Sequence, residues 1–559
     1  MLLEQNEVKL DKSDDKYQTP LLYATWNGHE EVVKILLGRD DVNPNKSDYD
    51  GVAPLWDAVF RGHEGIVKML LERDDVDPNM NTRDDGTPLW CAARAGNEGI
   101  VKLLLERDDI DPDWYDGWGG TPLCSAAENG HEGVVKILLG RGDVNLDGRG
   151  CYVLSPLSWA AQNGHEGVVK ILLGRDEVNP DKLNYSGRTP LSYAAQNGHE
   201  GVVKILLGRD DVNPDGRGRY GRIPLSCAAE NGHEGVVKIL LGRDEVNPNK
   251  PDESSRTPLW HAAENGHGGV VKILLGRDEV NPDKPDESSR TLLWRAAENG
   301  HEGVVKILLG RDDVNPDKPD NSGRTPLWCA ARKGHRGVVK MLLGRGDVDP
   351  NKPNDHGQTP LMCAANNGYE GVVEVLLGRG EVRPDKPDNG GRTPLSCAAG
   401  NGHEGVVKML LGQDDVNPNK PNNRGRTPLS FAAEYGHEGV VKILLRRGDA
   451  NPDKPDQSSR TPLWHAAENG HEGVVKILLG QDEVNPDKPN NRGRTPLSCA
   501  AGNGYEGVVK ILLGRDDVNP NKPVKFGRAP LQYASGRGRG RGGVVALLRP
   551  LVTSTHSTA

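Results

Sequence analysis

Apolar residues recur along the chain in pairs of short helical stripes, each pair followed by a polar loop. In residues 188–221, Leu191 and the two alanines at 194–195 give a first short helix with a small-residue face. A second stripe, with apolar positions at i, i+3 and i+4, follows over residues 199–207. Residues 212–221 are rich in Pro, Gly and polar side chains, which predicts an extended hairpin loop. One unit is therefore predicted to be helix, turn, helix and loop.

The ends of the first helix carry clear signals. Thr189 is a good N-cap, and Pro190 occupies the first helical position, where its missing N–H is tolerated. Gly198 has the freedom to take the left-handed conformation that ends a helix. Each helix is predicted to have about 9–10 residues, which is too short to persist alone in water. Stability must therefore come from stacking each unit on its neighbours.

The unit repeats with a fixed period of 34 residues, and sixteen units cover nearly the whole chain. Leu292 takes the place of the repeating proline in the one unit that lacks it. Elsewhere the proline of this motif is Pro20, Pro54, Pro88, Pro122, Pro156, Pro190, Pro224, Pro258, Pro326, Pro360, Pro394, Pro428, Pro462, Pro496 and Pro530.

The unit R-T-P-L-S-Y-A-A-Q-N-G-H-E-G-V-V-K-I-L-L at residues 188–207 resembles the ankyrin repeat, and the match extends over all sixteen units. The chain is most similar to the long ankyrin arrays common in fungal proteins. The resemblance implies an all-α solenoid of stacked helix-turn-helix units with β-hairpin-like fingers. It also implies that a partner protein binds on the concave surface of the fingers and first helices. Tetratricopeptide repeats share the 34-residue period, but their Trp and Gly-Tyr pattern is missing.

One residue departs from the family pattern in every unit. The His of the family's T-P-L-H motif normally ties adjacent units together, and here other residues replace it. Examples are Ser192, Trp260, Trp328 and Met362. We therefore expect the hydrogen bonds between repeats to differ from those of the family.

Composition and charge exclude several classes of protein. Aromatic residues are only 4% of the 559 residues, too few for several bulky cores. The net charge is −10, with acidic and basic residues interspersed, which is unlike a nucleic-acid-binding surface. No apolar run approaches the roughly 18 residues needed to cross a bilayer, and no signal peptide opens the chain. Eight scattered cysteines favour a reduced, intracellular location, either cytoplasmic or nuclear.

The sequence predicts a partial repeat at residues 1–17, an array at 18–548 and a disordered tail at 549–559. Residues 2–12 align with the end of a unit, so Met1 falls within the second helix of a repeat. We expect the chain to be a fragment, or an alternative start, of a longer protein. That protein could be of the signalling or NTPase type. The Arg-Gly run at 536–543 is interpreted as a low-complexity segment.

Repeating residues of types that can bind metals, form disulfides or act in catalysis are interpreted as structural. Twelve histidines follow glycine in the turn between helices, but equivalent positions in stacked units lie about 8–10 Å apart, too far to share a zinc ion. The same spacing exceeds the reach of a disulfide between cysteines at equivalent positions. Three Arg-Gly-Asp tripeptides occupy a turn that elsewhere carries Arg-Asp-Asp or Arg-Asp-Glu. Catalytic motifs are absent, so we expect no enzyme, no cofactor and no metal site.

The fingers of the first half differ from the uniform fingers of the second half. They carry Tyr, Trp and Arg, the residue types that dominate interface hot spots. Several of these rings are expected to be partly exposed, and first-helix rings extend the patch. We predict a monomer that binds a protein or peptide here, through Trp114, Tyr115, Trp118, Tyr152, Trp159, Tyr185, Tyr193, Arg217, Arg219, Tyr220 and Arg222.

Two alternatives to this interpretation stay open. Rings such as Trp118 and Tyr185 could pack against their own hairpin or an adjacent finger. The array could also act as a multivalent spacer, on the order of 150 Å long, with near-identical fingers that make weak repeated contacts. A specific binder would lose its partner when units 3–7 are deleted, whereas a spacer would lose function in proportion to the number of units removed.

Overall fold

The computed structural model describes residues 10–82, 86–115, 120–147, 154–523, 528–535 and 542–553; the side chains of Arg219, Val552 and Thr553 are outside this description. Within these ranges every regular element is a helix. The chain divides into two compact halves, Met1–Asn281 and Pro282–Ala559, which we call unit 1 and unit 2; the 34-residue units of the sequence are called repeats from here on.

In unit 1, each repeat contributes a first and a second helix, and a short 3₁₀ helix, η1 (Arg219–Gly221), lies in one loop. The first helices are α1 (Pro20–Trp26), α3 (Pro54–Phe60), α5 (Pro88–Ala95), α7 (Pro122–Asn129), α9 (Pro156–Asn163), α11 (Pro190–Asn197), α13 (Pro224–Asn231) and α15 (Pro258–Glu264). The second helices are α2 (Glu30–Leu37), α4 (Glu64–Leu71), α6 (Glu98–Leu105), α8 (Glu132–Leu139), α10 (Glu166–Leu173), α12 (Glu200–Leu207), α14 (Glu234–Leu241) and α16 (Gly268–Leu275).

Unit 2 has the same alternation. Its first helices are α17 (Leu292–Asn299), α19 (Pro326–Lys333), α21 (Pro360–Asn367), α23 (Pro394–Gly400), α25 (Pro428–Tyr435), α27 (Pro462–Asn469), α29 (Pro496–Asn503) and α31 (Pro530–Ala534). Its second helices are α18 (Glu302–Leu309), α20 (Arg336–Leu342), α22 (Glu370–Leu377), α24 (Glu404–Leu411), α26 (Glu438–Arg446), α28 (Glu472–Leu479), α30 (Glu506–Leu513) and α32 (Gly542–Thr553).

The capping signals of the sequence are confirmed in α11. The Thr189 hydroxyl accepts a hydrogen bond from the Ser192 N–H at 3.1 Å, and Pro190 begins the helix. Gly198 ends it with φ +80°. Both helices of this repeat have 8 residues, slightly fewer than predicted, because the cap residues at each end lie outside the helix.

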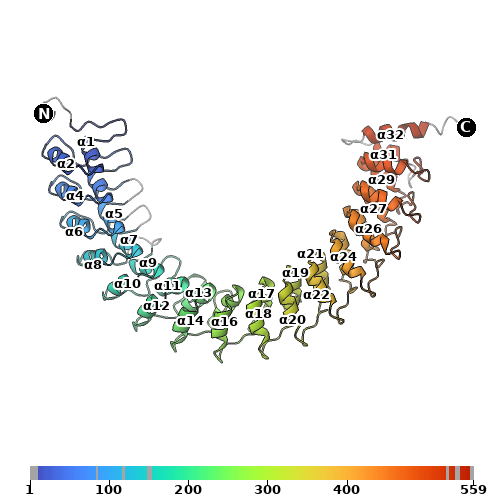
Figure 1. Cartoon of the computed structure of the whole chain (residues 1–559), viewed down its shortest axis with the longest axis horizontal. Helices are drawn as coiled ribbons and strands as arrows, with labels where there is room; N and C mark the ends of the chain where they lie inside the picture. The colour runs from blue at the N-terminus through green and yellow to red at the C-terminus, as the bar shows by residue number, and fades with distance from the viewer. Residues whose placement is uncertain are drawn as a thin grey trace. The chain divides into compact units, whose positions relative to one another are not determined.

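Within each unit the first helices form one layer and the second helices form another (Figure 1). Each helix packs on its counterpart in the next repeat, as α11 does on α9 and α13. The contact faces are built from Ala, Leu and Val, and Ala194, Ala195 and Val203 are fully buried. Small side chains on the first helix allow this close stacking, so the core runs along the array rather than filling a globule.

The histidine that follows glycine joins neighbouring repeats. His165 Nε2 lies 2.9 Å from the carbonyl oxygen of Glu128, in the first helix of the preceding repeat. Gly130, which ends that helix, has φ +77°, and a Cβ there would lie 2.6 Å from His165 Nδ1. Glycine is therefore required at this position both for its backbone conformation and for the space that the ring occupies.

Tryptophan makes a second link between repeats, at the position where the family motif has His. Trp328 Nε1 donates to the carbonyl oxygen of Gln358 at 3.0 Å, and Trp294 Nε1 donates to Arg324 at 2.8 Å. Where Ser stands instead, as at Ser396, its hydroxyl donates to the Thr393 carbonyl of its own repeat. At this position the bond between repeats is therefore made by Trp and is absent where Ser stands, as at Ser396; that these bonds differ from those of the family stays a prediction.

The Arg-Gly-Asp tripeptides are part of a recurring turn. Arg141 pairs with Asp143 at 2.8 Å and also donates to the carbonyl oxygen of Leu105 in the preceding repeat. Arg209 makes the same contacts with Asp211 and Leu173 in a turn where Asp210 replaces the glycine of the tripeptide. This confirms the structural interpretation of the tripeptide.

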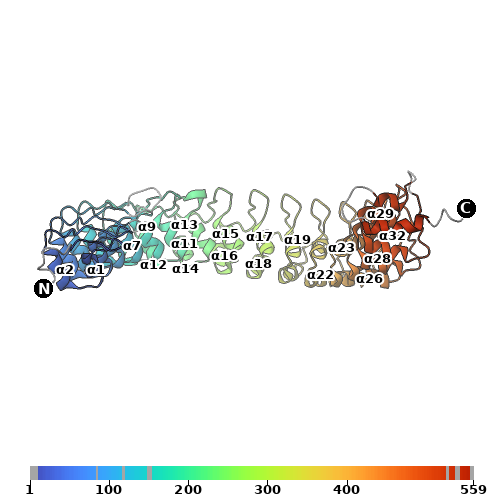
Figure 2. The ribbon, with the colours of Figure 1, turned by 90° about the horizontal axis from the view of Figure 1, so that it is seen from above.

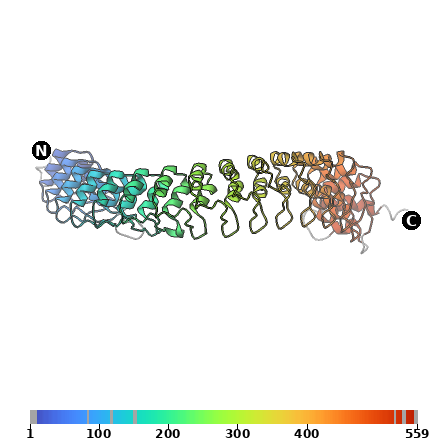
Figure 3. The ribbon, with the colours of Figure 1, turned by 90° about the horizontal axis from the view of Figure 1, so that it is seen from below.

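The loops between repeats, which we call fingers, are hairpin turns without strands in the described residues. In the finger before α15, the Asp252 N–H donates to the Arg256 carbonyl at 2.9 Å, and Asp252 Oδ1 accepts from the Ser254 and Arg256 amides. The side chain of Asp252 therefore replaces the strand pairing that a β-hairpin-like finger would have. The fingers before α13 and α15, and those before α19 and α21, project beyond the helices (Figures 2 and 3).

In unit 2 the fingertips are joined by a ladder of hydrogen bonds, which we call the amide ladder. The side-chain amide of Asn423 donates to the Asn389 carbonyl at 2.9 Å, and that of Gln457 donates to the Asn423 carbonyl at 2.9 Å. Backbone bonds accompany them, for example from Asn423 N to Gly390 O at 3.0 Å. Neighbouring fingers are therefore held in register with one another.

The last helix, α32, runs to Thr553, past residue 548, where the sequence predicted the array to end. Residues 554–559 of the expected tail, residues 1–9 and most of the Arg-Gly run lie outside the described residues. In the part of the chain that the structure describes, no helix has both the length and the apolar character needed to span a bilayer.

Candidate functional site

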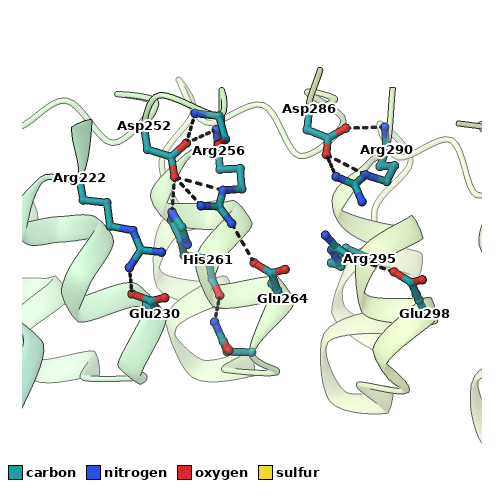
Figure 4. A network of polar contacts seen from close by, with 12 residues as sticks. Arg222, Glu230, Asp252, Arg256, His261, Glu264, Asp286, Arg290, Arg295 and Glu298 are labelled. Atoms are coloured by element: carbon teal, nitrogen blue, oxygen red, sulfur yellow. Dashed lines mark hydrogen bonds and ion pairs between the residues drawn. The ribbon is translucent and has the colours of Figure 1, made fainter. Parts of the chain in front are cut away.

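In each unit, a row of arginines lies along the groove between the fingers and the first helices. Each arginine stands two residues before the first residue of a first helix, and most bind an acidic side chain. Arg222 pairs with Glu230 on α13 at 2.6 Å, whereas Arg290 pairs with Asp286 of its own finger at 2.6 Å (Figure 4). The equivalent residues include Arg188, Arg256, Arg324, Arg392, Arg426 and Arg460.

In unit 1 this groove contains a cavity of about 400 Å³ between α11, α13 and their fingers. Its lining includes two arginines, two tyrosines, two serines and a cysteine, and no acidic residue. The lining residues that the sequence predicted are Tyr193, Tyr220 and Arg222; Arg188 belongs to the lining as well. Cationic, aromatic and hydroxyl groups thus face one small volume.

Tyr193 is held firmly on α11. Its hydroxyl accepts a hydrogen bond from Asn184 Nδ2 at 2.7 Å, and the Arg188 guanidinium lies 5.6 Å from its ring centroid. Arg188 also donates to Gln196 Oε1 at 2.6 Å. Partial burial raises the pKa of Tyr193, so the phenol stays neutral. The ring and the cation are therefore positioned before any partner arrives.

Tyr220 is placed by an unusual backbone. Its φ is +66°, which a bulky residue rarely adopts, and 58% of its surface is exposed. Gly218 stands where Asp252 stands in the next finger, so the side-chain bonds that order that finger are missing here. The Tyr220 carbonyl accepts from the Glu253 N–H at 3.0 Å, and the same bond between neighbouring fingers recurs in unit 2, for example from Asn321 N to Ser288 O. This bond fastens the tyrosine to the next finger.

A buried polar cluster lies beside this site on α15. Asp252 Oδ2 is 3.1 Å from both His261 Nε2 and the Arg256 guanidinium (Figure 4). His261 is 1% exposed, and its burial lowers the pKa of the imidazole. A histidine so enclosed cannot reach a substrate, so this Asp–His pair has a structural role. His465, Asp456 and Arg460 form a similar cluster in unit 2.

The cysteines behave as packing residues. The seven in the described ranges are all buried, which confirms their predicted role as packing residues. Burial raises the pKa of Cys227 to about 11 and that of Cys363 to about 12. Among the residues the structure describes, no group of three or more His, Cys, Asp or Glu side chains is placed to hold a metal ion.

The other predicted site residues are more dispersed. Trp114 and Tyr115 stack on each other with ring centroids 6.0 Å apart, and Tyr115 is 51% exposed. Trp159 is half-buried on α9, one repeat before Tyr193. Tyr185 is exposed at a fingertip, as is Arg217 in the next finger. The prediction that several of these rings are exposed is confirmed, and their role in binding stays a prediction.

Three predicted residues cannot be placed in this site. Trp118 and Tyr152 lie outside the described residues, as does the side chain of Arg219. The cavity also contains residues that the sequence analysis passed over, namely Arg188, Ser186, Ser192 and Cys227. An arginine at the position of Arg188 recurs in most repeats, so it does not stand out as a departure from the pattern, although its position before each first helix is the signal that places it in the groove.

The parts of the chain that match known family models follow the repeat pattern. The family model for ankyrin repeats in three copies matches residues 1–82, 75–148, 146–218, 210–286, 278–354, 346–422 and 415–488. The model for a single ankyrin repeat matches residues 492–524. No curated protein matches the chain significantly.

Proposed function

The chain belongs to the ankyrin-repeat family, whose repeats are generally protein-interaction modules, and we propose that it is a non-catalytic scaffold that binds a protein or peptide partner. The binding surface is formed by the fingers and first helices of unit 1. The array acts as a monomer and binds its partner inside the cell.

The cavity between α11 and α13 supports this proposal most strongly. It brings together Tyr193, Tyr220 and Arg222, which the sequence predicts as partner-binding residues from their residue types. Tyr and Arg in a preformed pocket have the character of interface hot spots. Because Tyr193 is already held by Asn184 and Arg188, little side-chain entropy is lost when a partner binds.

The test is capture of partners from a lysate of the source cells by the full chain and by a double variant, Tyr193→Ala with Tyr220→Gly. Glycine suits a φ of +66°, so the second change removes a ring without straining the backbone. Tyr49→Ala is the matched control, because Tyr49 is a fingertip tyrosine that is 64% exposed and lies outside the cavity.

We expect the double variant to lose its specific partner and the Tyr49 variant to retain it, with equal thermal stability for all three chains. Capture that is unchanged in the double variant would refute the site. The same set can include Trp114→Ala, which tests whether the Trp114–Tyr115 pair extends the surface.

A multivalent spacer is the second candidate, and the amide ladder of unit 2 favours it because it holds uniform fingers in register. Deleting residues 86–255 or residues 324–493 removes the same number of repeats and keeps the 34-residue period. A scaffold of the proposed kind loses its partner only with the first deletion. A spacer loses function equally with either.

A further inference from the structure

A second groove lies in unit 2, on the same finger side of the first helices. A cavity of about 480 Å³ is lined by Arg324, Trp328, Arg332, His356 and Arg392 among others. A neighbouring cavity of about 650 Å³ shares His356 and Arg392 with it and continues to Arg424, Arg426 and Phe431. Because they share walls, the two cavities form one groove across several repeats, which we call the arginine groove.

The arginine groove has lost acidic residues that other repeats keep. Glu230, Glu264 and Glu434 occupy one position near the end of the first helix, and each binds the groove arginine eight residues before it. In three consecutive repeats of unit 2, this position carries Arg332, Asn366 and Gly400 instead.

The finger of the middle repeat is altered too. Asn354 stands where Asp320 and Asp388 stand in the flanking repeats, and Gln358 replaces the groove arginine. The first cavity is consequently lined by three arginines and no Asp or Glu, and the second adds two arginines and a single acid, Asp388. Arg324 and Arg392 are each paired with the Asp of their own finger, and Arg426 is paired with Glu434. Arg332 and Arg424 therefore supply the excess of positive charge in the arginine groove, although the chain as a whole is acidic.

Two of these arginines are held against a ring. The guanidinium carbons of Arg324 and Arg332 lie 5.9 and 5.6 Å from the Trp328 ring centroid. Arg324 binds Asp320 through Nε and Nη2. Among the described residues nothing binds its Nη1, so the Nη1 donors can bind an acceptor on a partner. A planar fork held in this way is suited to a carboxylate.

The groove also offers contacts for a peptide main chain and for apolar side chains. Amides of Gln358, Asn366 and Asn367 line the first cavity, and Met362 is buried at its base. Trp328 is only 4% exposed, so its face cannot stack on a nucleic-acid base. An occupant with carboxylates, peptide groups and some apolar side chains matches this lining.

We propose that the arginine groove binds an extended, acidic segment of a partner protein, with glutamate or aspartate side chains placed against Arg324, Arg332 and Arg392. The proposal rests on the proposed function, since it assigns the array a protein ligand. The chemistry of that ligand is acidic, and the arginine groove is separate from the cavity between α11 and α13 in unit 1. Arg332 is the main determinant, because it is exposed and replaces an acid at its position.

The test is fluorescence anisotropy with the full chain and labelled 12-residue peptides of Glu, Leu and Gly. Analogues in which every Glu is replaced by Gln or by Lys measure the requirement for charge. We expect the Glu peptide to bind, with a dissociation constant that rises with salt, and the two analogues to bind at least about tenfold more weakly.

Two variants locate the binding. Arg332→Glu and Asn366→Glu are each expected to raise the dissociation constant of the Glu peptide about tenfold. Asn366→Glu restores the residue found at Glu264 and Glu298, so it is compatible with the fold. Arg94→Glu is the matched control, because Arg94 is the equivalent of Arg332 and lies 5.1 Å from the Trp90 ring in unit 1.

Equal binding of the Glu and Gln peptides, or equal losses in Arg94→Glu and Arg332→Glu, would overturn the proposal. So would a single-stranded oligonucleotide of the same charge that binds as tightly as the Glu peptide. If the peptide fails to bind while Tyr193→Ala with Tyr220→Gly still abolishes partner capture, the arginine groove is refuted and the proposed function stands. If neither effect is seen, both are refuted.

Discussion

His165 Nε2 lies 2.9 Å from the carbonyl oxygen of Glu128, and its ring occupies the space above the glycine that ends α7. The same contact recurs along the chain, for example from His199 to Gln162 and from His437 to Gly400. One side chain therefore satisfies a carbonyl at the end of a helix in the preceding repeat, where no intrahelical donor is available.

Replacing His165 with Ala is expected to lower the free energy of local opening by about 1 kcal/mol, the usual net contribution of one hydrogen bond. Hydrogen exchange of peptides from residues 122–174 measures this loss. His165→Tyr separates the hydrogen bond from the packing of the ring, because Tyr369 and Tyr505 show that a tyrosine ring fits over the glycine. Equal exchange in the Ala variant and the parent chain would contradict the role of the link.

Gly130→Ala should destabilise the same region by about 2 kcal/mol, because a left-handed conformation is strained for Ala and the new Cβ displaces the His165 ring. The control is Gly142→Ala in the following turn. Nothing lies within 4 Å of a Cβ at Gly142, and its φ is not left-handed. Urea unfolding of both variants should show a loss for the first and little change, or a small gain, for the second.

The buried histidines should make stability depend on pH. Burial lowers the pKa of His261 and of His465 below the value near 6.5 that an unfolded chain has. Their neutral forms are favoured in the fold, so their contribution is complete above about pH 6.5 and is lost as the pH falls through the folded pKa. Thermal unfolding between pH 7.5 and 5 should show a falling melting temperature.

A variant with His261→Cys and His465→Cys should flatten this dependence. Cysteine already occupies the equivalent buried position at Cys227 and Cys329, so the replacement fits the core. His356→Gln, at an exposed finger position, serves as the control and should leave the dependence intact. A slope that is unchanged in the double variant would show that other groups cause it.

The buried thiols should resist modification in the native chain. With pKa values of about 11 for Cys397 and about 12 for Cys499, roughly a thousandth or less of each thiol is ionised at pH 8. Ellman's reagent should therefore react slowly with the seven described cysteines, and quickly with all eight in urea. Any fast signal should disappear in Cys151→Ser; a fast signal that persists would show that a buried position opens readily.

The local structure of each repeat could be predicted because its causes lie close together in sequence. Thr189, Pro190 and Gly198 mark the ends of one helix within ten positions, and the 34-residue period shows that helices stack. The bonds between repeats were harder to predict. Trp328 reaches the carbonyl of Gln358, and only the stacked structure shows which finger lies beside that ring.

The candidate site was predicted only in part, for a related reason. Tyr193, Tyr220 and Arg222 stood out as departures from the repeat, and the structure places them around one cavity. Arg188 was passed over because it recurs. The arginine groove was not predicted because its signal is the absence of acidic residues. Arg332 and Asn366 stand where other repeats have Glu, and this absence can be interpreted only when the arginine that binds the Glu is known to lie nearby.

The links between repeats have a consequence for how such a chain can grow. Each donor finds its acceptor at a constant separation in sequence, 37 residues for His165 and Glu128 and 36 for Arg209 and Leu173. A gene duplication that inserts a whole 34-residue copy therefore presents every donor with an acceptor of the kind it already had. The array can lengthen by copying itself without any further adaptation, and new recognition can then arise wherever a copy loses one charged residue.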